Sequence, residues 1–158
     1  MERNIGIHFA ILICAFMFIG SSPRAQENTP EELVSYSFKA PNAVTIGAIF
    51  EIKAIFDIQP GWYVYAPLAF NANQGKIVTK VTFRLPDGVE FVGSMALPEG
   101  GGATYTGKGV TMAQRLKVVK AFPDGQVVIP ANVVYQTCND HICYPPVREK
   151  INIDITIK

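Results

Sequence analysis

The stretch of sequence that decides the fold runs from Val44 to Ile58 and reads VTIGAIFEIKAIFDI. Every even-numbered residue in it is apolar, whereas polar side chains such as Glu51, Lys53 and Asp57 occupy odd-numbered positions. Successive side chains of a β-strand point to opposite faces, so an alternation with a period of two indicates a strand that buries one face. The stretch therefore predicts a β-strand packed against a hydrophobic core.

The same alternation recurs further along the chain. Isoleucine occupies every second position from Ile151 to Ile157, and apolar residues alternate with polar ones in 80–85. A weaker run covers 112–118, and 127–135 is apolar enough for a more fully buried strand. No segment has the apolar stripe, repeating every 3.6 residues, that an amphipathic helix requires.

Short turn sequences separate these runs, and each contains glycine or proline. They lie at 59–61, 73–75, 86–88, 123–125 and 144–146. About seven short strands in a domain of this size predict an all-β fold, an immunoglobulin-like β-sandwich. A small β-barrel is the alternative that the pattern leaves open.

The N-terminus has the features of a secretion signal. Arg3 provides a basic start, an apolar run covers 8–19, and small residues follow at 20–22. The apolar run is shorter than the roughly 20 residues that a membrane span needs. The features predict a signal peptide at 1–25. An uncleaved membrane anchor and a lipid anchor at Cys14 are the alternatives.

Removal of the signal peptide would leave a flexible leader at 26–32 and one domain at 33–158, large enough to bury a core without disulfides. Lys and Arg number 14 and Asp and Glu 13, a formal net charge of +1 that disfavours a nucleic-acid surface. No second apolar run reaches spanning length, so we expect no membrane span in the mature chain. Export would place the domain where disulfides form and persist.

Cys138 and Cys143 are the only cysteines beyond the expected signal peptide. A disulfide closing about six residues removes only ~2 kcal/mol of unfolded-chain entropy, against ~4.7 kcal/mol for a loop of about 100 residues. A bridge this short can be broken without unfolding the domain. Aromatic residues, Pro145 and Pro146 crowd the pair, which is more typical of a shaped site than of a structural clip.

Three interpretations of this pair compete. The first is a structural disulfide that closes a hairpin. The second is a metal site, in which Cys138, His141 and Cys143 would be ligands and Met95 or Met112 a fourth. The third is thiol–disulfide exchange through a mixed disulfide with a partner protein, with no cofactor beyond the disulfide itself.

Other chemistry-bearing patterns are missing from the sequence. It contains no phosphate-binding P-loop, no dinucleotide fingerprint and no HExxH zinc motif. After removal of the signal peptide, His141 is the only histidine, which disfavours a Ser-His-Asp triad. The segment 98–109 contains five glycines around Tyr105, which predicts a mobile loop with one aromatic side chain at its centre.

Three segments, in this order along the chain, resemble the N-terminal domain of the thiol:disulfide interchange protein DsbD. They are PGWYVY at 60–65, YTGK at 105–108, and VYQTCNDHICYPP at 134–146. The resemblance covers roughly residues 33 to 157. It implies an immunoglobulin-like fold with an inserted active-site loop region.

The resemblance also implies roles for individual residues. Cys143 would enter the mixed disulfide and Cys138 would resolve it. Tyr105 would be the aromatic residue of a cap loop that covers the disulfide until a partner docks. The residues that line the pocket and its rim would be Tyr63, Tyr65, Tyr144 and Pro145.

The resemblance further implies that the protein is a periplasmic thiol:disulfide oxidoreductase. A thioredoxin-like protein or a membrane thiol carrier would act in trans as electron donor, because the chain ends at Lys158, after its last expected strand. Oxidised periplasmic proteins would be the acceptors. A secreted immunoglobulin-like binding module with a structural disulfide is the competing hypothesis.

Overall fold

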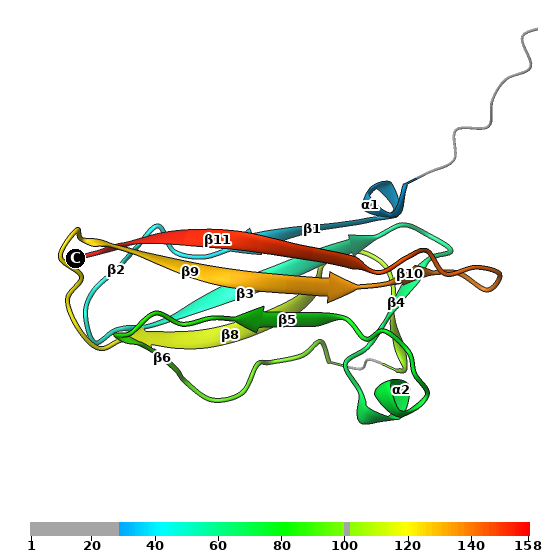
Figure 1. The fold of residues 1–158 in the computed structure, drawn as a ribbon, viewed down its shortest axis with the longest axis horizontal. Coiled ribbons are helices and arrows are strands. Elements are labelled where there is room, and N and C mark those ends of the chain that lie inside the picture. The colour runs from blue at the N-terminus through cyan, green and yellow to red at the C-terminus, as the bar shows by residue number, and fades with distance from the viewer. Residues whose placement is uncertain (1–28, 100–101) are drawn as a thin grey trace, which may run out of the picture.

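The computed structural model describes residues 29–99 and 102–158, and its longest strands form two packed β-sheets (Figure 1). The first sheet contains, in spatial order, β1 (Val34–Lys39), β3 (Ile49–Ile58), β8 (Val110–Val118) and β6 (Val89–Phe91). The second contains β2 (Ala43–Val44), β11 (Val147–Ile157), β9 (Gln126–Tyr135) and β5 (Lys80–Phe83). All neighbouring strands are antiparallel except β2, which runs parallel to β11.

The order of the strands is that of an immunoglobulin domain. When β1, β3, β5, β6, β8, β9 and β11 are lettered A to G in chain order, the first sheet reads ABED and the second GFC. The predicted immunoglobulin-like β-sandwich is therefore confirmed, and the chain does not form the small barrel that was its alternative.

The hydrophobic core lies between the two sheets because each sheet turns its alternate residues inward. Every even-numbered residue of β3 and every odd-numbered residue from Val127 to Tyr135 in β9 is buried. Ile153 and Ile155 of β11 join them. Burial stabilises each large apolar side chain by about 1.5–3 kcal/mol, so these strands form the rigid part of the molecule.

The stretch 44–58 forms two strands in different sheets, and the prediction of one continuous strand was wrong. A turn separates β2 from β3: the Ala48 N–H donates to the Thr45 carbonyl (3.0 Å), and Gly47 has a φ of 85°. Glycine reaches this left-handed conformation without steric cost. Ile46 is consequently 43% exposed although it fits the apolar alternation.

Two short helices accompany the sheets. α1 (Pro30–Leu33) is a single turn before β1, and α2 (Ala69–Asn73) follows β4. Within the described ranges, no helix is long and apolar enough to cross a membrane. The predicted signal peptide at 1–25 and the first part of the leader, 26–28, lie outside the described residues.

A third, smaller sheet lies at one end of the sandwich. It contains β10 (Thr137–Cys138), β4 (Tyr63–Tyr65) and β7 (Thr104–Tyr105), in this spatial order. These strands are inserted into the connections β9–β11, β3–β5 and β6–β8 respectively. Figure 1 shows β4, β10 and α2 at the end opposite the C-terminus. The insertions thus bring residues from three distant parts of the sequence together.

Candidate functional site

Cys138 and Cys143 form a disulfide in a β-hairpin at this end of the sandwich. Their sulfur atoms are 2.04 Å apart and their Cα atoms 4.1 Å apart. The two residues face each other across an antiparallel bridge. Opposed residues that exchange no backbone hydrogen bonds lie close together in any antiparallel ladder, with Cα atoms about 4.5 Å apart. The hairpin backbone therefore brings the two sulfur atoms together.

The hairpin is also held by hydrogen bonds that do not involve sulfur. The Asn139 side-chain oxygen accepts hydrogen bonds from the backbone N–H groups of His141 (2.9 Å) and Ile142 (2.8 Å), and this arrangement is an Asx-turn. The Asn139 N–H donates to the Ile142 carbonyl (2.9 Å), and the Tyr144 N–H donates to the Thr137 carbonyl (2.9 Å). Each such bond contributes about 0.5–1.5 kcal/mol. The turn therefore has its own support when the disulfide is open.

The two cysteines differ sharply in exposure. Cys138 is 0% exposed, whereas Cys143 is an exposed residue. The cause is their place in the small sheet: β10 lies between β4 and the strand of the hairpin that carries Cys143. Cys143 is therefore the more accessible residue of the pair, while Cys138 is covered.

Tyr63 and Tyr65 lie on the same face of the small sheet as Cys138. The register places Tyr63 directly opposite Cys138, and the rings of the two tyrosines are 5.6 Å apart and nearly perpendicular. The Tyr63 hydroxyl donates to the Asn139 carbonyl (3.3 Å). The hydroxyl of Tyr65, partial burial and the charge of Asp140 raise the pKa of Tyr63 above its ordinary value. Tyr63 therefore stays a hydrogen-bond donor to the hairpin at neutral pH.

Tyr105 lies on the opposite face of the same sheet. It pairs with Val64, which in turn pairs with Thr137, one residue before Cys138. Because strand side chains alternate, the side chains of Tyr105, Val64 and Thr137 point away from the face that carries Cys138 and Tyr63. Tyr105 is 6% exposed and packs in the core. The ring thus anchors the glycine-rich loop to the core, on the far side of the sheet from the disulfide.

Tyr144 and Pro145 continue the chain directly after Cys143. The ring of Tyr144 lies 5.5 Å from that of Trp62, with a 34° angle between their planes. The Gln136 side-chain amide donates to the Tyr144 carbonyl (3.0 Å). Pro145 is exposed. These contacts fix the chain that leaves the hairpin, and they place an aromatic pair beside the exposed cysteine.

Two asparagines that the sequence analysis did not single out support the site. Asn139 forms the Asx-turn, and its position immediately after a cysteine of a short loop is a signal that could have identified it. Asn71 of α2 is 2% exposed, and its amide donates to the carbonyls of Ala66 (2.9 Å) and Ala103 (2.6 Å). It ties α2 to the loop before β7, a contact that no local pattern predicts.

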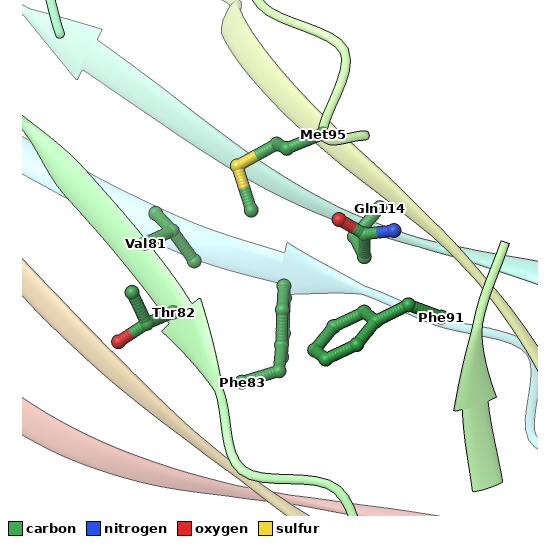
Figure 2. A pocket seen from close by; sticks show the side chains of 6 residues that line it. All are labelled: Val81, Thr82, Phe83, Phe91, Met95 and Gln114. Atoms are coloured by element: carbon green, nitrogen blue, oxygen red, sulfur yellow. The ribbon is translucent and has the colours of Figure 1, made fainter. Parts of the chain in front are cut away.

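The ligands of the metal hypothesis are not assembled as a site. No group of three or more His, Cys, Asp or Glu side chains suited to a metal ion occurs in 29–99 or 102–158. The sulfur atoms of Cys138 and Cys143 are bonded to each other, and Met112 is buried in β8. Met95 lies in an apolar pocket of about 260 Å³ between β5 and β8, beside Phe83 and Phe91 (Figure 2). Apart from Met95, none of the predicted site residues lines that pocket.

Several solved structures are similar to this chain, among them the following three. The N-terminal periplasmic domain of ScsB from Proteus mirabilis is 15% identical with a TM-score of 0.48, over 80% of this chain and 49% of that one. The present chain thus spans about half the length of the ScsB chain. The DsbD N-terminal domain of Neisseria meningitidis, in its reduced form, is 22% identical with a TM-score of 0.39, over 82% and 90% of the two chains.

A cohesin module from a Clostridium perfringens family 33 glycoside hydrolase is 8% identical with a TM-score of 0.40, over 80% of this chain and 98% of that one. No curated protein matches the chain in sequence.

The family comparison gives a match that covers the sandwich and the small sheet together. Residues 30–155 match the family described as "Thiol:disulfide interchange protein DsbD, N-terminal". The matched region includes both cysteines of the hairpin and all three inserted strands. The chain therefore belongs to the DsbD N-terminal domain family.

Proposed function

We propose that this protein is a periplasmic thiol:disulfide oxidoreductase that relays electrons through Cys138 and Cys143. A thioredoxin-like protein or a membrane thiol carrier reduces the pair, and the reduced pair passes the electrons to oxidised periplasmic proteins. The observation that carries the proposal is that Cys143 is exposed whereas its disulfide partner Cys138 is buried. The hydrogen bonds of the hairpin support its turn independently of the disulfide. Membership of the DsbD N-terminal family supports it.

Reduction of the protein begins at the exposed cysteine. A donor thiolate attacks Cys143 Sγ, the Cys138–Cys143 bond breaks, and Cys138 leaves as a thiolate that takes up a proton. A second thiol of the donor then attacks the mixed disulfide and releases Cys143. Two electrons and two protons have passed to the pair, and the donor leaves as a disulfide.

Delivery of the electrons reverses these roles. The Cys143 thiolate attacks a disulfide of the acceptor, and one acceptor thiol leaves. Cys138 then attacks Cys143 Sγ, restores the intramolecular disulfide and releases the acceptor with both thiols reduced. The backbone of the hairpin keeps Cys138 opposite Cys143 during the exchange, so the second step needs no large movement.

The neighbouring aromatic residues have a supporting role in this proposal. Tyr63 and Tyr65 form a wall on the Cys138 face, and Tyr144 and Pro145 form the rim next to Cys143. The glycine-rich loop would act as the cap, and Tyr105 would hold its base against the core. A cleaved signal at 1–25 would deliver the domain to the periplasm.

Trapping of the mixed disulfide tests the assignment of the two cysteines. Reduced Cys138→Ser and Cys143→Ser proteins are each mixed with an oxidised peptide disulfide, quenched by alkylation and analysed by mass spectrometry. We expect a stable adduct through Cys143 in the Cys138→Ser protein, and little or none in the Cys143→Ser protein. Equal adducts in both proteins would contradict the assigned order.

Redox titration separates exchange from a structural disulfide. In the exchange proposal, the wild-type pair opens in buffers near the thioredoxin potential of about −270 mV. A pair that stays closed there, together with loss of stability as the only effect of Cys138→Ser/Cys143→Ser, would favour the binding module with a structural disulfide instead.

A further inference from the structure

The outer face of the second sheet carries an unbalanced group of positive charges. The alternation that buries the odd-numbered residues of β9 and β11 turns the even-numbered ones outward. Lys80, Arg84, Arg148 and Lys150 all lie on this outer face and are exposed; we call them the cationic strip. The acidic side chain on this face is Asp154, beyond the strip toward the far end of β11.

The outer face of the first sheet is different, because most of its charges lie opposite a charge of the other sign. Glu51 is opposite Arg115 and Glu90 is opposite Lys117 in the register, and Lys53 forms an ion pair with Glu51 (3.1 Å). Opposite charges in such positions stabilise a sheet. The ion pairs found in the described part of the chain include none of the four strip residues. One like-charged pair, Lys39 opposite Lys53, remains on the first sheet, but acidic residues lie among its cations, whereas the strip itself contains four cations and no acidic residue.

A hollow lies at the centre of the strip. Arg148 and Lys150 are two residues apart on one face, roughly 6.6 Å between Cα atoms. With Asn132, which is opposite Lys150, they line a hollow of about 220 Å³. Glu149 also lines the hollow, but its carboxylate accepts a hydrogen bond from the hydroxyl of Tyr36, which belongs to the first sheet. Two cations and an amide beside a hollow are the donors that a carboxylate requires.

The strip begins next to the redox hairpin. Arg148 is five residues after Cys143, so their Cα atoms are at most about 18 Å apart. Lys80 and Arg148 flank the same β9 residue, the last outward-facing one before the hairpin. Figure 1 shows β5 and β11 starting, and β9 ending, at the hairpin end of the sandwich. A partner protein whose thiol reaches Cys143 would have its own surface over these charges.

We infer that the cationic strip binds an acidic surface beside the reactive cysteine of the exchange partner. The inference rests on the proposed exchange at Cys143 and specifies the kind of partner that takes part in it. Complementary charge raises association rates by 10–10³-fold, and the effect decreases with ionic strength because the Debye length shrinks from about 30 Å at 0.01 M to about 8 Å at 0.15 M salt. The strip would therefore select among thiol proteins by their charge.

Two cysteine peptides of equal length, one with four glutamates and one with four lysines, test this inference. Each is reacted with the oxidised protein at low and high salt, and exchange is followed by alkylation and mass spectrometry. Each rate is divided by that of the same peptide with hydroxyethyl disulfide, which removes differences in thiol reactivity. We expect the glutamate peptide to react about tenfold faster at low salt, and the preference to vanish at high salt.

Two charge-reversal variants locate the effect. Arg148→Glu/Lys150→Glu should abolish or reverse the preference. The matched control, Lys39→Glu/Lys53→Glu, makes the same change in net charge at two lysines that face each other on the first sheet. It should keep the preference.

Four results would overturn the inference. Equal normalised rates for the two peptides, or an equal effect of both variants, would show that the strip does not select the partner while exchange itself stands. Salt-sensitive sedimentation with phosphatidylserine vesicles, without any peptide preference, would assign the strip to a lipid surface. If neither peptide nor dithiothreitol opens the disulfide in any variant, the proposed function fails and the inference falls with it.

Discussion

Reduction of the Cys138–Cys143 disulfide should lower the free energy of unfolding by no more than about 2 kcal/mol. The sequence separation of the pair is five residues, and a loop this short removes only ~2 kcal/mol of entropy from the unfolded chain. The Asx-turn of Asn139 and the bond between Tyr144 and Thr137 remain after reduction. The sandwich core contributes most of the stability and does not depend on the bridge.

Urea unfolding of the oxidised and the reduced protein measures this difference. Far-UV circular dichroism reports the sheets, and the fluorescence of Trp62, the only tryptophan, reports the environment of Tyr144. With a slope of about 1–3 kcal/mol/M, the midpoint should move by roughly 1 M. Reductant should have no effect on the control, Cys138→Ala/Cys143→Ala.

A larger loss would refute the reasoning. If reduction removed more than about 4 kcal/mol, or abolished the cooperative transition, the disulfide would be holding the fold together. The hairpin could then not open and close during turnover without unfolding the domain, and the structural-disulfide hypothesis would be favoured.

Three further results are expected. Asn139→Ala should slow the oxidation of the reduced pair to the disulfide, measured by quenching with an alkylating agent at successive times. It should also lower the free energy of unfolding in urea by about 1–2 kcal/mol, because two backbone N–H groups lose their acceptor. Asn71→Ala should cost about 1–3 kcal/mol because the two hydrogen bonds from the Asn71 amide are lost, although each carbonyl keeps a backbone donor. The exposed Asn73→Ala should cost little. Burial raises the pKa of Tyr135 to about 12, above the value of about 10 in the unfolded chain. The free energy of unfolding should therefore be constant below about pH 10 as far as Tyr135 is concerned, and should fall as the pH rises toward 12. Circular dichroism should show a smaller fall in Tyr135→Phe.

The fold was predictable because most of its strands are amphipathic in a simple way. The isoleucines at every second position of β11 and the alternation within β3 coincide with buried faces. The break at Gly47 was not predictable from hydrophobicity, because Ile46 keeps the alternation while the backbone turns. The pattern reports which face of a strand is buried, and it does not report which sheet the strand joins.

The site was predictable only in part, and for a related reason. Family motifs pointed to Cys138, Cys143 and the tyrosines around them, and these residues do meet at one end of the sandwich. The faces on which they lie depend on the register of two- and three-residue strands. That register is set by tertiary pairing, which is why the placement of Tyr105 on the core face required the structure.

The 4.1 Å separation of the Cys138 and Cys143 Cα atoms also has a consequence for how long intermediates survive. Two thiols joined by a flexible linker already have effective concentrations of the order of mM, and a preformed turn raises this value further. A mixed disulfide on Cys143 should then be resolved by Cys138 long before a free thiol in solution reaches it. The protein would accordingly hold its partners only briefly, and electrons would pass through it without covalent complexes accumulating.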